Sequence, residues 1–144
     1  MPATSDKITR LRAQAREYGL SGLTFIERFS DDELAEVYNG IGPEWFPAKI
    51  RRAIDELHSD LECCALIHDV RFACNDGTTT QFNFANAELE ANGVLVANAK
   101  YAWYDPRRYI RRHQARVFAD LCQCFGWSAY IAARINRLNP KRKE

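Results

Sequence analysis

The stretch ALIHDVRF, residues 65–72, decides the fold, because it joins a helical apolar pattern to the chain's one adjacent His-Asp pair. Apolar residues continue from it in both directions at intervals of three and four. We therefore expect a helix from Leu61 to about Ala73, one face of which is formed by Leu61, Cys64, Ala65, His68 and Phe72. This placement puts His68 on the apolar face, with Asp69 beside it.

The composition fits one domain with an apolar core of its own. The 144 residues are 47% hydrophobic and 27% charged, with a formal net charge of +1. No stretch approaches the roughly 20 apolar residues of a membrane span, and the N-terminus lacks the apolar segment of a secretory signal. The five cysteines are an odd number without a CxxC pair, which favours reduced thiols. We expect a single helical domain over residues 1–144, located in the cytoplasm.

Upstream of the central stretch, the capping signals predict short helices. Ser5 and Asp6 can cap a helix that runs to about Tyr18. Ser30 followed by Glu33 forms a capping box and opens the helix DDELAEVY. A further helix is expected to start at Pro47 and to break or bend at residues 58–60.

Downstream, residues 75–77 (NDG) signal a turn, and either a short hairpin or a loop is expected near residues 74–82. A helix from about Phe82 carries Asn86, with Gly93 as a weak point. Asp105-Pro106 opens a basic helix over about 106–138, with a kink near Gly126. The predicted fold is mainly α, with the His68 helix antiparallel to the Asn86 helix and a motif-bearing core over about 30–100.

The two side chains of the His-Asp pair can have different functions. Adjacent residues on a helix point about 100° apart, so His68 and Asp69 face different partners. A histidine with a pKa near neutrality can take a proton from water. A carboxylate can hold a metal ion that polarises a substrate. The alternative is a buried histidine that serves only as a hydrogen-bonded core residue.

The segment YNGIG, residues 38–42, adds a candidate cation site. Its glycines allow backbone conformations that expose several carbonyl groups on one side. Calcium takes several oxygen ligands, carbonyls among them, and a carboxylate supplies charge. The segment together with Asp69 therefore predicts a calcium site, whereas a tight turn between two helices would explain the glycines equally well.

Taken in order, these pieces resemble the phospholipase A2 superfamily. Residues 38–42 are similar to its calcium loop, Y-x-G-x-G. Residues 63–72, with CC followed by HDVRF, resemble its catalytic helix, and residues 85–89 (ANAEL) resemble the A-D-x-x-F element of the shorter viral and prokaryotic members. The resemblance covers residues 38–89, about a third of the chain.

The resemblance implies a calcium-dependent esterase acting at the sn-2 position of phospholipids. His68 would be the general base, and Asn86 would orient its ring as the second catalytic residue. The metal ligands would be the backbone carbonyls and carboxylate of Tyr38, Gly40, Gly42 and Asp69. Calcium and a loop amide would stabilise the oxyanion, and the partner would be a phospholipid substrate or membrane surface.

The sequence departs from the family pattern at important positions. Asn86 stands where the family has an aspartate, so it can accept a hydrogen bond but cannot stabilise an imidazolium by charge. Phe72 replaces a tyrosine, and an insertion lengthens the segment between loop and histidine. These departures imply reduced or lost activity. The nearby carboxylates that remain candidates for the missing charge are Glu88, Glu90 and Asp105.

Two other functional classes remain open. HD-type phosphohydrolases are helical and use His-Asp, but His58 lies only ten residues before His68, too near for their usual ligand spacing. A binding module is the main alternative to an enzyme: the last helix interleaves aromatic and apolar residues with arginines at positions 107, 108, 111, 112 and 116. Such a face suits anionic lipid or, less favoured, nucleic acid, and it also fits an ordinary amphipathic helix. The sequence does not determine the oligomeric state.

Overall fold

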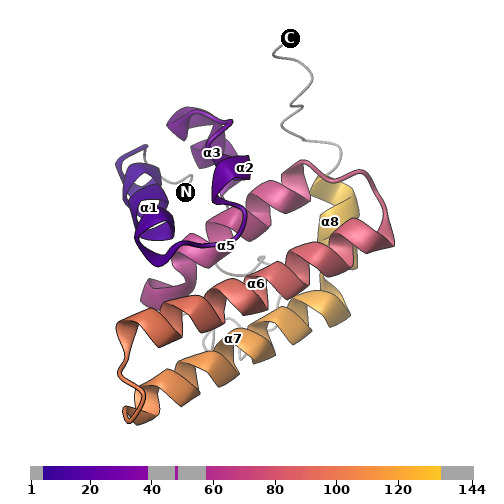
Figure 1. The fold of residues 1–144 in the computed structure, drawn as a ribbon. Coiled ribbons are helices and arrows are strands. Elements are labelled where there is room, and N and C mark those ends of the chain that lie inside the picture. The colour runs from indigo at the N-terminus through magenta and orange to yellow at the C-terminus, as the bar shows by residue number, and fades with distance from the viewer. Residues whose placement is uncertain (1–4, 39–47, 49–57, 134–144) are drawn as a thin grey trace.

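The computed structural model describes residues 5–38, 48 and 58–133, and within these ranges the chain is mainly helical, without strands. The mainly α prediction is confirmed. Figure 1 shows the helices, which are α1 (Ser5–Tyr18), α2 (Leu23–Ile26), α3 (Asp31–Val37), α5 (His58–Ala73), α6 (Thr79–Lys100), α7 (Pro106–Phe125) and α8 (Trp127–Ala133). No helix in the described ranges has both the length and the apolar character needed to cross a bilayer.

Three long helices, α5, α6 and α7, follow one another in antiparallel hairpins (Figure 1). Helix α6 packs against both α5 and α7, while α1 and α3 pack against α5 and α8 returns to contact α5 and α7. The predicted antiparallel pairing of the His68 helix with the Asn86 helix is therefore confirmed. Helix α5 is the centre of the arrangement, because α1, α2, α3, α6 and α8 all pack against it.

Local capping explains where several helices begin and end. Ser30 precedes α3, and its hydroxyl accepts from the backbone N–H of Glu33 at 3.2 Å, as the capping box predicts. Asp105 caps α7, whose first residue is Pro106. Gly19 ends α1 with a φ of 63°, a left-handed conformation that favours glycine.

The prediction at residues 58–60 is wrong, whereas between α5 and α6 the structure has the loop alternative and not the hairpin. Residues 58–60 form the first turn of α5 rather than a break before it. The hairpin considered near residues 74–82 does not form, because the Thr78 hydroxyl caps α6, which starts at Thr79. The Asn75 amide donates to the carbonyls of Phe72 and Tyr130 at 2.6 and 2.7 Å, which holds the connection against α8.

Two further predictions concern glycines. Helix α6 continues through Gly93 to Lys100, so the expected weak point is wrong. Near Gly126 the structure has a full helix end instead of a kink, and α8 starts at Trp127. The helix predicted to start at Pro47, and the end of the basic helix beyond residue 133, lie outside the described residues.

The N-terminal helices are joined to the hairpin by polar side chains of α6. Asn92 accepts from the backbone N–H of Ser21 and donates to its carbonyl, both at 2.9 Å. Glu88 accepts two hydrogen bonds from the Arg71 guanidinium at 3.0 and 3.1 Å, and a third from the Ser21 hydroxyl at 2.8 Å. The connection between α1 and α2 is thereby fixed to α5 and α6 at once.

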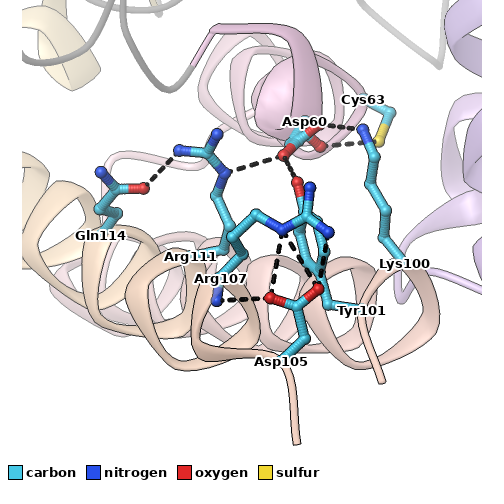
Figure 2. A network of polar contacts seen from close by, with 8 residues as sticks. All are labelled: Asp60, Cys63, Lys100, Tyr101, Asp105, Arg107, Arg111 and Gln114. Atoms are coloured by element: carbon cyan, nitrogen blue, oxygen red, sulfur yellow. Dashed lines mark hydrogen bonds and ion pairs between the residues drawn. The ribbon is translucent and has the colours of Figure 1, made fainter. Parts of the chain in front are cut away.

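A buried carboxylate, Asp60, joins the start of α5 to the end of α6 and the start of α7 (Figure 2). It accepts from the Lys100 ammonium, from the Tyr101 hydroxyl at 2.9 Å and from Arg111 Nε at 2.9 Å. Burial acts to raise the pKa of Asp60, but hydrogen bonds from Lys100 and Tyr101 and the nearby positive charges outweigh it and hold that pKa below its usual value. The ionised form of Asp60 therefore stabilises the packing of three helices.

We expect Asp60→Asn to lower the free energy of unfolding by about 2 kcal/mol at neutral pH, since the two cations keep partial access to water. Because the pKa is lowered in the folded state, this contribution is present above the usual aspartate pKa of about 3.9 and is lost as the pH falls through the folded value. Urea unfolding of both proteins at neutral pH and below about pH 3 tests this. An equal difference between them at both pH values would contradict it, and Asp120→Asn, at an exposed site on α7, is the control.

Gly93 permits close contact between α6 and α7, because a methyl group at this position would overlap the methyl group of Ala115. We expect Gly93→Ala to destabilise the fold by about 2 kcal/mol, although alanine favours a helix over glycine by about 1 kcal/mol. Ala115→Gly in the same chain should recover most of the loss. Urea unfolding of the two single variants and the double variant measures the coupling. A Gly93→Ala variant more stable than the wild type would contradict this expectation, because it would show that α6 and α7 can move apart at this point with little loss of free energy.

Candidate functional site

The His-Asp pair lies in the second half of α5, with its two members in different surroundings. The His68 side chain is 7% exposed, and its ring lies 4.2 Å from the Phe72 ring. The Asp69 side chain is 21% exposed. His68 Nδ1 is 3.9 Å from Asp69 Oδ1, which is too long for a hydrogen bond. The expectation that the two side chains do not hold each other closely is confirmed.

The structure brings His68 and Asn86 together across the α5–α6 interface. His68 Nε2 is 2.8 Å from Asn86 Oδ1. Asn86 Nδ2 donates to Gln123 Oε1 at 2.8 Å, and Gln123 Nε2 donates to Asn83 Oδ1 at 2.7 Å. These four residues, His68, Asn86, Gln123 and Asn83, form a chain of side-chain hydrogen bonds across α5, α6 and α7, named the amide relay below.

The amide relay fixes the tautomer of the neutral histidine. Because the Asn86 amide nitrogen donates to Gln123, its oxygen faces His68 and can only accept. His68 Nε2 therefore carries a proton, and Nδ1 has the free lone pair in the neutral ring. The atom able to take a proton from water is thus the one on the Asp69 side of the ring.

Tyr38 lies at the end of α3, where its backbone N–H donates to the Leu34 carbonyl at 2.9 Å. Its ring is buried, and burial, followed by the negative charges of Glu62 and Asp69, raises the pKa of the hydroxyl. Two of the residues predicted to bind calcium, Tyr38 and Asp69, therefore lie within electrostatic range of each other. The other two, Gly40 and Gly42, lie outside the described residues.

The side chains of the described residues do not by themselves make a metal centre, because no group of three His, Cys, Asp or Glu residues among them could hold an ion. A cation beside Asp69 would need further oxygen ligands, such as backbone carbonyls. This donor requirement fits a hard ion such as calcium better than zinc, which takes nitrogen and sulfur ligands.

Two carboxylates considered as substitutes for a second aspartate have other partners. Glu88 forms an ion pair with Arg71 of α5 and accepts from Ser21, in the connection between α1 and α2. Asp105 caps α7 and pairs with Arg107 at 2.7 Å. Neither therefore supplies charge to His68, and the orienting group in the structure is the neutral Asn86.

Sequence reasoning missed two members of the relay, Asn83 and Gln123. Asn83 lies three residues before Asn86 and so shares its face of α6, a spacing visible in the sequence. Gln123 comes from α7, and only the packing of that helix against α6 brings it near. The HD-type alternative requires His58 and His68 to bind the same metal ion. His58 begins the same helix as His68, and the two residues are roughly 15 Å apart along the helix axis, too far to share an ion.

No protein-family model matches the chain, and neither a curated protein nor a solved structure matches it significantly.

Asn86→Ala should lower the free energy of unfolding by about 2 kcal/mol, because it leaves His68 without its acceptor and Gln123 without its donor inside the fold. Asn83→Ala, at the exposed end of the relay, should change it by less than about 0.5 kcal/mol and is the matched control. Ring nitrogen chemical shifts should place the proton of neutral His68 on Nε2 in the wild type. A proton on Nδ1 would contradict the assigned direction of the relay.

Proposed function

We propose that this chain is a phospholipase A2-like ester hydrolase of reduced activity, acting on the sn-2 ester of a phospholipid. The observation that carries the proposal is the contact between His68 Nε2 and Asn86 Oδ1 at 2.8 Å, because it orients the ring from the side opposite to Nδ1. A general base needs this combination of a fixed ring and an open lone pair.

In the proposed reaction, His68 Nδ1 accepts a proton from the water molecule that attacks the ester carbonyl. Nε2 keeps its proton and continues to donate to Asn86 throughout. We place the ester on the Asp69 side of Nδ1, because the Asp69 side chain is 21% exposed whereas Phe72 is buried. The proton is later returned to the leaving alcohol oxygen, so His68 serves as base and then as acid.

Asp69 would hold calcium together with backbone carbonyls of Tyr38, Gly40 and Gly42. When bound, calcium would supply the positive charge that polarises the ester carbonyl. Asp69 suits this role because it is partly exposed and lies 3.9 Å from His68 Nδ1, close to the reacting water.

The amide at position 86 sets the expected level of activity. Asn86 fixes the ring by a hydrogen bond but adds no negative charge next to the imidazolium that forms during the reaction. A charged partner stabilises that state more strongly than a neutral one. We therefore place the activity below that of an enzyme with an aspartate here. The odd number of cysteines, without a CxxC pair, favours reduced thiols and supports a cytoplasmic site of action.

Hydrolysis of phospholipid in mixed micelles, with and without calcium, tests the proposal. His68→Gln and Asp69→Asn should each lower the rate about 100-fold or more, and only Asp69→Asn should also remove calcium binding in calorimetry. Asn86→Asp should raise the rate about tenfold, because it supplies the missing charge. Asp120→Asn, an exposed carboxylate on α7, is the matched control and should behave as wild type.

A wild type and an Asn86→Asp variant that are both folded and both inactive with calcium would overturn the hydrolase proposal. Calcium-dependent hydrolysis that persists in His68→Gln would overturn the assignment of His68 as the base.

A further inference from the structure

The turn between α6 and α7 lies at one end of the helical hairpin (Figure 1). Large aromatic and apolar side chains of this turn and of the first turns of α7 are exposed. Trp103 and Tyr104 are each 73% exposed, and their rings lie 5.7 Å apart, edge to face. Tyr109 and Ile110 of the first turns of α7 are 51% and 52% exposed. These four residues, Trp103, Tyr104, Tyr109 and Ile110, are named the aromatic tip. A contiguous exposed patch of this kind often marks a site of interaction.

The aromatic tip is held by an ordered turn. The Tyr109 hydroxyl donates to the Trp103 carbonyl at 2.7 Å. Asp105 caps α7 and pairs with Arg107, whose guanidinium lies 5.0 Å from the Tyr101 ring (Figure 2). Since Asp60 in turn fixes Tyr101, the tip is supported by the core of the hairpin, and its exposed rings are presented outward.

Positive charge surrounds the aromatic tip. Residues 98–117 contain six Lys or Arg residues and a single acidic residue, Asp105, which Arg107 already neutralises. In the part of the chain that the structure describes, Arg108, Arg112 and Arg116 make no ion pair. The face around the tip therefore carries an excess of uncompensated positive charge.

We infer that the aromatic tip and its arginines bind an anionic lipid surface. Tryptophan and tyrosine favour the boundary between headgroups and acyl chains, where one part of the ring is apolar and another is wet. Ile110 adds an aliphatic side chain that is 52% exposed, and Arg112 and Arg116 follow it along α7, where they can pair with lipid phosphates. A second copy of the chain is a poor occupant, because two tips of equal positive charge repel each other.

Lipid is also a better match than single-stranded nucleic acid. Nucleic acid stacks its bases on aromatic faces along a basic groove. Here Trp103 and Tyr104 contact each other edge to face, and the aliphatic side chain of Ile110 is exposed in the first turns of α7. The inference is independent of the proposed hydrolase, because His68, Asp69 and Asn86 are not part of the tip and vesicle binding requires no catalysis.

Tryptophan fluorescence with vesicles tests the inference directly. The chain has three tryptophans, so Trp45→Phe with Trp127→Phe leaves Trp103 as the only reporter. Its emission should shift to shorter wavelength, and brominated lipids should quench it, with vesicles of phosphatidylcholine mixed with phosphatidylglycerol. Vesicles of phosphatidylcholine alone should have little effect, and added salt should weaken the response.

Co-sedimentation with the same vesicles assigns the residues. Trp103→Ser with Tyr104→Ser should lower the partition coefficient about tenfold or more. Arg112→Gln with Arg116→Gln should lower it about tenfold or more on the anionic vesicles only. Phe125→Ser is the matched control, because this residue is 53% exposed at the opposite end of α7, roughly 28 Å away along the helix.

Circular dichroism confirms that each variant is folded. Absence of binding to anionic vesicles would overturn the inference, and so would binding that the tip variants leave unchanged. A Trp103 emission that responds to a single-stranded oligonucleotide and not to vesicles would replace the lipid with nucleic acid.

Discussion

The fold depends on one constraint: α5 is buried on almost every side and still carries ionisable and polar side chains. A buried polar group without a partner costs about 1–3 kcal/mol, so each such group requires a partner on a neighbouring helix. Asp60 meets cations of α6 and α7, Glu62 meets Lys7 of α1 at 2.9 Å, and His68 meets Asn86 of α6. Apolar burial makes α5 the centre, and these polar contacts decide which face meets which neighbour.

The polar contacts are spread along the length of α5. Asp60 acts in its first turn and His68 in its second half. Asn75 lies just beyond its end, where its amide nitrogen donates to the Tyr130 carbonyl of α8 and its oxygen accepts from the Gly77 N–H of the following turn. Contacts at several heights define the register between α5 and the surrounding helices more strictly than one contact could. His68, Asp69 and Asn86 therefore lie on packed helices, where the position of a ring can be held within the tolerance that catalysis requires.

The amide at position 86 has a consequence for the whole relay. An amide accepts and donates, so Asn86 can accept from His68 and donate to Gln123 at the same time. A carboxylate only accepts, so Gln123 would have to turn its nitrogen toward position 86 and give up its present donation to Asn83. The neutral Asn86 therefore fits its neighbour Gln123 on α7. It completes a hydrogen-bond network that a carboxylate at this position would rearrange.

The sequence by itself determined the helical class, because the three-and-four spacing in residues 61–73 and the capping residues Ser30 and Asp105 act locally. It also predicted the contact between His68 and Asn86, through a resemblance in residue order. Its turn signals were ambiguous at residues 74–82, where Thr78 could have preceded a strand or a helix. Local chemistry alone did not decide that point.

Only the tertiary structure decided which distant residues share a site. Gln123 joins the relay because α7 packs on α6, and Asp60 has its three donors because the ends of two other helices meet it. The exposure of Trp103 likewise depends on what the fold leaves uncovered, since aromatic residues in a sequence are more often core than surface. Spacing along one helix is a local property, whereas contacts between helices are set by the burial and pairing of all of them together.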